Sequence, residues 1–232
     1  SLHSRDKQQL PAAFAMVVDL NCNMLRCWGG NVYEDHDFFD LCDRNGIMVW
    51  QDFALACAIY PQTDAFADEI RIEAEAVVQK LRNHPSLALW AGNNEIDDAY
   101  TGWFGFPLAP NTDRLSRQVL PEVIRQYDPL RDFLPSSPYH SPAMIQAGNQ
   151  SHLKPEDHLW GPRDDFKSKF YTSSPAHFVS ETGYHGCPDR KSLEQMIDPA
   201  SVWPWQNNEQ WLTHAVRPLP SMTSYNYRIP LI

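Results

Sequence analysis

Short apolar segments alternate with longer amphipathic segments along most of this 232-residue chain, and this alternation restricts the possible folds most strongly. Six segments are predicted to be strands, at residues 20–30, 46–52, 86–93, 131–137, 157–161 and 176–183. Helices are predicted at residues 34–46, 64–83, 113–128 and 189–197, with an opening helix at 5–20. Strands separated by helices in this way are typical of a parallel α/β fold.

Two parallel architectures fit six such units, a doubly wound sheet or most of an eight-stranded barrel. Polar and aromatic residues follow nearly every predicted strand, at Trp28, Gln51, Asp52, Asn93 to Glu95, Ser136, Ser137, His158, Trp160 and Glu181. Barrel enzymes draw substrate contacts from the C-terminal ends of many strands, whereas a doubly wound sheet concentrates them at one switch point. We therefore predict an α/β fold of the (β/α)8 TIM-barrel type.

The net charge of the chain restricts the classes of partner that it can bind. With 19 Lys and Arg against 29 Asp and Glu, the formal net charge is -10, which disfavours nucleic acid because phosphate binding needs a clustered basic surface. The sequence contains no GxGxxG or GxxxxGK phosphate-binding motif and no membrane-length apolar run. We expect a neutral partner such as a sugar, and neither nucleic acid nor membrane; the compartment stays open.

A carboxylate follows the third predicted strand in the segment LWAGNNE, where Glu95 comes directly after Asn93 and Asn94. Partial removal from water at a strand end suits a general acid, and Asn94 is placed to bond a sugar hydroxyl beside it. The alternative is a carboxylate at a helix start with asparagine caps. Residue types alone leave both interpretations open.

A second carboxylate, Glu181, ends the apolar strand of the segment HFVSETG, with Gly183 allowing a sharp turn after it. Glycosidic cleavage needs two carboxylates, one to protonate the leaving oxygen and one to attack or to direct water. The two glutamates are 181 − 95 = 86 residues and three predicted strands apart, so they can face one another across a barrel mouth.

Four ordered segments, MLRCWGGNVYE, FFDLCDRNGIMVWQDF, NHPSLALWAGNNE and HFVSETG, together resemble the catalytic barrel of glycoside hydrolase family 2, in its β-mannosidase branch. The resemblance covers residues 20–189. It implies that Glu95 is the acid/base, on the fourth barrel strand, and that Glu181 is the nucleophile, on the seventh. It also implies that Trp28 and Asn94 contact the sugar, with no cofactor or metal.

Three further residues complete the predicted site. His158 and Trp160, at the end of the sixth barrel strand, are additional candidate sugar contacts, and Asp52 is expected in the binding site, where it orients neighbours by hydrogen bonds. The five cysteines, at positions 22, 27, 42, 57 and 187, are interpreted as buried thiols, because they lack the spacing of a zinc site.

The predicted barrel is incomplete. Counting back from the assigned strands places the first strand before Ser1, and no eighth strand is evident before Ile232. We expect residues 1–201 to form part of the catalytic barrel, and residues 202–232, rich in proline and aromatic residues, to be its irregular tail. Family members carry β-sandwich domains before the barrel, which are the expected partners of this chain within a longer protein.

The predicted activity is hydrolysis of terminal non-reducing β-D-mannose from an oligosaccharide or glycoside, by a retaining double displacement. Two alternatives stay open. One keeps the mechanism and changes the sugar, since exo-β-glucosaminidases resemble the same WGG and NNE motifs. The other is a non-catalytic carbohydrate-binding module or an inactive barrel that serves as a scaffold, against which the two opposed carboxylates argue.

Overall fold

A computed structural model describes residues 3–103, 108–148, 151–160, 167–183, 188–205 and 208–214. The chain divides into two compact units. The first consists of Ser1–Asp157 and Ala176–Phe178, and the second of His158–Pro175 and Val179–Ile232. Each unit is described by itself below.

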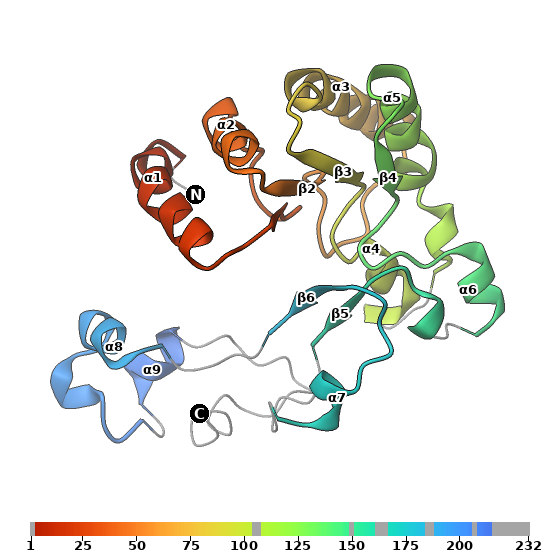
Figure 1. Ribbon diagram of the computed structural model, residues 1–232. Helices are drawn as coiled ribbons and strands as arrows, with labels where there is room; N and C mark the ends of the chain where they lie inside the picture. The colour runs from red at the N-terminus through yellow and green to blue at the C-terminus, as the bar shows by residue number, and fades with distance from the viewer. Residues whose placement is uncertain are drawn as a thin grey trace. The chain divides into compact units, whose positions relative to one another are not determined.

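A parallel four-stranded sheet forms the centre of the first unit (Figure 1). Its strands, in both chain order and sheet order, are β1 (Met24–Cys27), β2 (Met48–Asp52), β3 (Leu87–Ala91) and β4 (Asp132–Leu134). The register pairs Cys27 with Gln51, and Ala91 with both Asp52 and Leu134. The carboxyl ends of neighbouring strands therefore lie level, and the residues that follow them are brought together.

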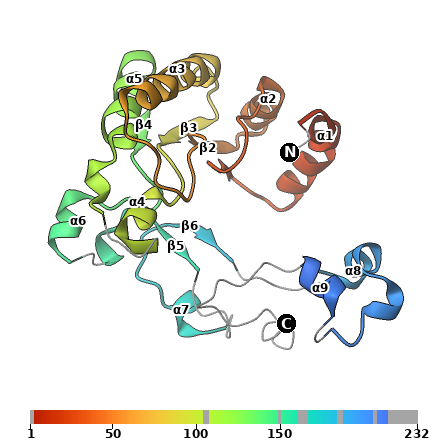
Figure 2. The same cartoon turned by 180° about the vertical axis from the view of Figure 1, so that it is seen from behind.

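Helices follow the strands of the first unit, and α3 and α5 lie side by side next to β3 and β4 (Figures 1 and 2). The longer helices are α1 (His3–Asp19), α2 (His36–Asn45), α3 (Asp64–Leu81) and α5 (Leu120–Tyr127). Val78 of α3 and Val123 of α5 are fully buried in one core with Trp90 of β3. Burial of such apolar side chains stabilises the sheet by roughly 1.5–3 kcal/mol each.

Local signals set the helix ends. The Thr63 side chain accepts a hydrogen bond from the Phe66 amide at 3.4 Å and caps the start of α3. Gly46 ends α2 in the left-handed conformation, with φ of 65°, which glycine adopts without steric cost. The region predicted as one helix at 113–128 consists of a π-helical turn, Leu115–Val119, followed by α5.

Short elements complete both units. The first also contains the helices α4 (Ile96–Asp98) and α6 (Pro142–Gln146), and turns at Ala99–Trp103, Pro110–Thr112 and Ser151–Leu153. A two-stranded sheet, β5 (Asp157–Leu159) with β6 (Val179–Thr182), begins at the unit boundary. The second unit adds the helices α7 (Lys169–Thr172), α8 (Arg190–Met196) and α9 (Glu209–His214), and a turn at Pro199–Ser201.

All six predicted strands and the opening helix are present, with shorter bounds than the apolar segments. Within the described ranges, however, the strands form an open four-stranded sheet and a separate pair, so a closed barrel is not seen. Irregular structure was expected beyond residue 201, yet residues 209–214 form α9, because Trp211 packs with Leu193 and Ile197 in a small apolar cluster. Residues 206–207 and 215–232 of the predicted tail lie outside the described residues.

No helix in the part of the chain that the structure describes has both the length and the apolar character needed to cross a membrane.

Candidate active site

Glu95 lies four residues beyond the end of β3, where the parallel hydrogen bonding of the sheet continues past the strands. The Asn94 amide donates to the Leu55 carbonyl at 2.9 Å, and the Glu95 amide donates to the Ser137 carbonyl at 2.7 Å. The backbone is thus held from both neighbouring strand extensions. Glu95 itself has φ of 57° and ψ of 22°, a left-handed conformation that costs a non-glycine residue about 1–3 kcal/mol.

Glu95 lies at a helix start with an asparagine cap, as the alternative interpretation expected. Glu95 precedes α4, but its side chain makes no capping hydrogen bond. The Asn93 side-chain oxygen instead accepts from the Ile96 amide at 3.2 Å and from the Ser136 hydroxyl at 2.6 Å. Capping is therefore done by Asn93, and the Glu95 carboxylate accepts from the Cys57 thiol instead.

A network of hydrogen-bonded polar side chains contacts Asn94, the residue before Glu95. Arg26, inside β1, donates through Nη2 to Asp52 Oδ2 at 2.8 Å and to Asn94 Oδ1 at 2.8 Å. Asp52 also accepts from Trp50 Nε1 at 2.7 Å and from the Gly29 amide at 3.0 Å. The ion pair is enclosed, because the Asp52 side chain is 0% exposed and that of Arg26 is 13% exposed.

The placement of Asp52 decides how it acts. Burial raises the pKa of the Asp52 carboxyl, and Arg26 and the two N–H donors oppose that rise. Because both of its carboxylate oxygens bond protein groups in the interior, Asp52 serves the site by orienting Arg26 and the turn at Gly29. This geometry fits the predicted role of Asp52 in orienting its neighbours by hydrogen bonds.

The Cys57 thiol reaches Glu95 from the loop after β2. Its Sγ accepts from Asn94 Nδ2 at 3.3 Å and donates to Glu95 Oε2 at 3.6 Å. Cys57 is exposed, Cys42 is buried, and Cys22 and Cys27 are intermediate, so the prediction of buried thiols is wrong for Cys57. A polar neighbourhood explains the difference, since this thiol is hydrogen-bonded instead of packed in the core. Cys187 lies outside the described residues.

Trp28 follows β1 and presents an open aromatic surface. It is 45% exposed, unusually high for a tryptophan of a folded domain. Its ring lies over Gly30 so closely that a Cβ at Gly30 would approach ring atoms to 2.0 Å. The second glycine of the WGG turn is therefore required for the position of this ring, which offers a stacking surface of the kind that binds sugars.

Glu181 belongs to the second unit and lies on β6 with two ring systems beside it. Trp160 Nε1 donates to Glu181 Oε2 at 2.9 Å, and His158 Nδ1 lies 3.5 Å from the same oxygen. The side chains of His158 and Glu181 are 2% and 20% exposed. The two residues predicted as additional sugar contacts thus hold the predicted nucleophile, while Trp160 itself remains 38% exposed.

The structure groups the predicted residues in two sets. Asp52, Asn94 and Glu95 meet in the first unit, where Trp28 adjoins them through the Gly29 amide; His158, Trp160 and Glu181 meet in the second. Sequence reasoning missed Arg26 and Cys57. A charge inside the apolar strand MLRC was a usable signal for Arg26, because a buried charge needs a partner. Nothing in the sequence distinguishes Cys57 from the other cysteines.

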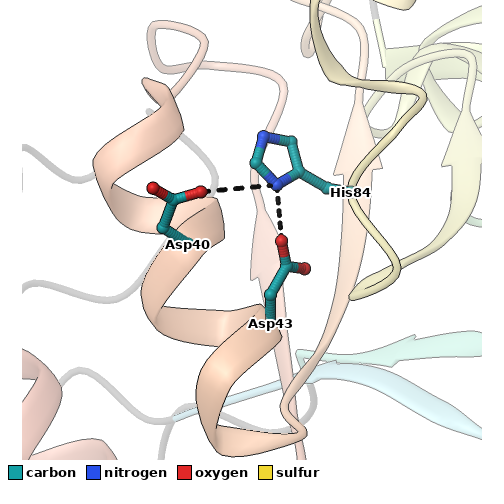
Figure 3. Close-up of side chains that lie close together, drawn as sticks. All are labelled: Asp40, Asp43 and His84. Atoms are coloured by element: carbon teal, nitrogen blue, oxygen red, sulfur yellow. Dashed lines mark hydrogen bonds and ion pairs between the residues drawn. The ribbon is translucent and has the colours of Figure 1, made fainter.

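A separate cluster of possible metal ligands lies in the first unit, where α2 meets the start of β3 (Figure 3). His84 Nδ1 is 2.6 Å from Asp43 Oδ2 and 3.9 Å from Asp40 Oδ1. Two ligands of one tetrahedral zinc ion lie about 3.3 Å apart, so the shorter distance is that of a hydrogen bond. Asp43 also accepts from the Ser86 amide at 2.9 Å. These hydrogen bonds connect α2 to the segment that precedes β3.

Known proteins of similar sequence include β-mannosidases. The chain is 37% identical over 204 residues to the β-mannosidase of Bos taurus, covering 83% of this chain and 23% of that protein. It is 34% identical over 195 residues to β-mannosidase B of Thermothelomyces thermophilus, covering 78% of this chain and 22% of that protein. The crystal structure of β-D-mannosidase from Dictyoglomus thermophilum superimposes with a TM-score of 0.74 at 34% identity, over 83% of this chain and 23% of that chain.

The chain is thus homologous to β-mannosidases and shares their local fold. It spans about a quarter of the length of these relatives. No known family profile matches it.

Proposed function

We propose that this chain supplies the catalytic carboxylates of a retaining exo-β-mannosidase. The observation that carries the proposal is the position of Glu95, held at a strand end in a left-handed conformation by bonds from both neighbouring strand extensions. Strain of this kind persists where the surroundings fix it and clusters at active sites. The homologues, all β-mannosidases among those compared above, support the same reaction and the same sugar.

The first step in this proposal forms a covalent mannosyl-enzyme. Glu181 attacks the anomeric carbon as the glycosidic carbon–oxygen bond breaks, and Glu95 gives its proton to the departing oxygen. The hydrogen bond from Trp160 Nε1 to Glu181 Oε2, at 2.9 Å, orients the attacking carboxylate. His158, 3.5 Å from the same oxygen, limits its rotation.

The second step releases mannose. Glu95, now ionised, takes a proton from water as the oxygen of that water attacks the anomeric carbon and Glu181 departs. Two inversions return the sugar to its original β configuration. The mechanism requires the two carboxyl groups to lie about 5–5.5 Å apart, whereas inversion would need about 6.5–9.5 Å.

Sugar binding in this proposal uses side chains that keep hydrogen-bonding or stacking capacity. The amide nitrogen of Asn94 has two N–H donors, one of which is directed at Cys57 Sγ, and the second is proposed to bond a sugar hydroxyl. The exposed ring of Trp28 is proposed to stack on the sugar. Trp160 offers a further aromatic face beside the proposed nucleophile.

Residues 1–201 are proposed to form part of the catalytic barrel, with the remaining strands and the β-sandwich domains supplied by a longer polypeptide. No cofactor or metal takes part in the proposed chemistry, because both proton transfer and attack are assigned to carboxylates.

Release of p-nitrophenol from the β-mannoside tests the proposal, with the β-glucosaminide and β-galactoside in parallel. The assay uses the full-length polypeptide that carries this sequence, with the isolated 232-residue chain beside it. We expect the mannoside to be cleaved at least tenfold faster than the other two. Faster cleavage of the glucosaminide would replace the proposed sugar and keep the mechanism.

The Glu181→Gln variant separates an enzyme from a binding module. It keeps the size of the side chain, so sugar binding should survive while turnover falls by roughly 10⁴-fold or more. Binding of mannose without turnover of any glycoside by the unmodified polypeptide would favour the binding or scaffold alternative.

A further inference from the structure

The Cys57 thiol lies at the end of a hydrogen-bonded chain that runs from the buried ion pair to the proposed acid/base. Arg26 Nη2 donates to Asn94 Oδ1 at 2.8 Å, Asn94 Nδ2 donates to Cys57 Sγ at 3.3 Å, and Sγ donates to Glu95 Oε2 at 3.6 Å. Every link belongs to the first unit.

The direction of this chain follows from what each group can donate. A guanidinium has donors and no acceptor, so Arg26 requires the oxygen of the Asn94 amide to face it. The Asn94 nitrogen must then face the sulfur, and the sulfur must accept. The single hydrogen of the thiol is left for the Glu95 carboxylate, because a thiol carries one weak donor and the carboxylate accepts.

The backbone holds the thiol in this place. The Cys57 amide donates to the Asn94 carbonyl at 2.9 Å, and Cys57 has φ of 51°, a left-handed conformation that few non-glycine residues adopt. Glu95, with φ of 57°, shares this feature. Both left-handed residues are therefore connected to Asn94, Cys57 by a hydrogen bond and Glu95 by the peptide bond that follows Asn94.

We propose that Cys57 is a positioning residue for Glu95, which fixes the carboxyl group for proton transfer to the leaving oxygen. This inference rests on the proposed function. Fixing one carboxylate oxygen sets the orientation of the carboxyl plane, and proton transfer depends on that orientation.

Substrates with different leaving groups isolate this role. A mannobioside needs protonation of its leaving oxygen, whereas 2,4-dinitrophenyl β-mannoside expels an acidic phenol that does not. In the full-length polypeptide, Cys57→Ala should lower kcat/KM about tenfold on the mannobioside and less than about twofold on the dinitrophenyl glycoside.

Two further variants serve as controls. Cys57→Ser keeps a donor at this position and should retain most of the mannobioside activity. Cys22→Ala removes a thiol outside the hydrogen-bonded chain, three residues after the end of α1, and should leave the turnover of both substrates unaffected.

The possible results are distinct. An equal loss on both substrates would show a packing role and overturn the proposal, and so would unchanged kinetics in Cys57→Ala. Absence of dinitrophenyl β-mannoside turnover by the unmodified polypeptide would instead overturn the proposed function on which the inference rests.

Discussion

The surroundings of Glu95 and Glu181 differ in what positions each carboxylate. Glu95 follows an inner strand of a four-stranded sheet, and its backbone and that of Asn94 bond the extensions of both neighbouring strands. Glu181 lies on a strand of a two-stranded sheet, and the contacts that hold its carboxylate come from the side chains of His158 and Trp160.

The difference teaches that two carboxylates with matched tasks can depend on different kinds of structure. The backbone hydrogen bonds around Glu95 also hold the sheet together, so changes to them are expected to lower stability before activity. The side chains that contact Glu181 can be changed without altering the backbone, so such changes are expected to lower activity before stability. The first three predictions below test this contrast, and the fourth concerns a site remote from both carboxylates. They run from the largest expected effect to the smallest.

Removing the buried partner of Arg26 should give the largest loss of stability. Asp52→Ala leaves the guanidinium without its carboxylate in a site with little solvent, so the free energy of unfolding should fall by about 3–5 kcal/mol. Urea denaturation measures this. Asp37→Ala removes an exposed carboxylate 3.8 Å from Lys7 and should cost less than about 1 kcal/mol. Equal costs for the two variants would contradict the supporting role of the network.

Alanine at Gly92 and at Gly183 should act in opposite ways. A Cβ at Gly92 would lie 2.2 Å from the Pro135 carbonyl oxygen, so Gly92→Ala should destabilise the protein by about 3 kcal/mol, because backbone must move. A Cβ at Gly183 would meet the Trp160 ring at 2.8 Å, and a side chain can shift. Gly183→Ala should therefore keep most of the stability and lose activity.

Thermal denaturation and mannoside turnover, measured on both glycine variants, test whether Gly92→Ala loses stability and Gly183→Ala loses activity. The contrast fails if Gly183→Ala unfolds at as low a temperature as Gly92→Ala, or if Gly92→Ala retains the stability of the unmodified protein.

The Trp160→Phe variant tests the side-chain support of Glu181 most narrowly. Phenylalanine keeps an aromatic ring and lacks the Nε1 donor, so kcat/KM on the mannoside should fall about tenfold, or about 1.4 kcal/mol, with an unchanged melting temperature. Trp203→Phe, at a tryptophan that is 71% exposed, is the matched control and should behave as the unmodified protein. Full activity of Trp160→Phe would remove Trp160 from the positioning of Glu181.

The smallest effect is expected at the opposite end of β3, where His84 bonds Asp43 (Figure 3). The Ser86 amide donates to the same carboxylate. Burial raises the pKa of the Asp43 carboxyl, but the bonds from Ser86 and His84 outweigh it and lower the pKa below 3.8. A lowered pKa stabilises the fold above pH 3.8, and this contribution disappears as the pH falls through the folded-state pKa.

Asp43→Asn should therefore be less stable than the unmodified protein by about 1 kcal/mol at pH 7, with a difference that shrinks below about pH 4. Asp40→Asn, 3.9 Å from His84 and 47% exposed, should differ by less than about 0.5 kcal/mol throughout. Denaturation curves at several pH values measure both. A constant difference for Asp43→Asn would contradict the linkage.

The sequence predicts the elements of this molecule better than it predicts their connections. Apolar periodicity locates β1 to β6 and α3, because burial of one face leaves a pattern along the chain. Arg26 bonds Asp52, which lies 26 positions further along the chain, and Asn94, which lies 68 positions further along. No local sequence pattern specifies contacts over such separations.

The candidate site follows the same rule. Glu95 and Glu181 are recognisable because each ends an apolar strand inside a distinctive motif. His158 and Trp160 are predicted to contact sugar, and their contact with Glu181 could not be read from the sequence, since it depends on the pairing of β5 with β6. Left-handed backbone at Cys57 and Glu95 leaves no trace in residue type, because glycine is absent at both positions.

The most direct test of the central claim is to trap the covalent intermediate with 2-deoxy-2-fluoro-β-mannosyl fluoride and to locate the label by peptide mass spectrometry of the full-length polypeptide. Our account predicts a single fluoromannosyl ester on Glu181, absent from Glu181→Gln, with Glu95 unlabelled. A label on another carboxylate, or turnover of the mannoside to the α-anomer without any trapped ester, would contradict it.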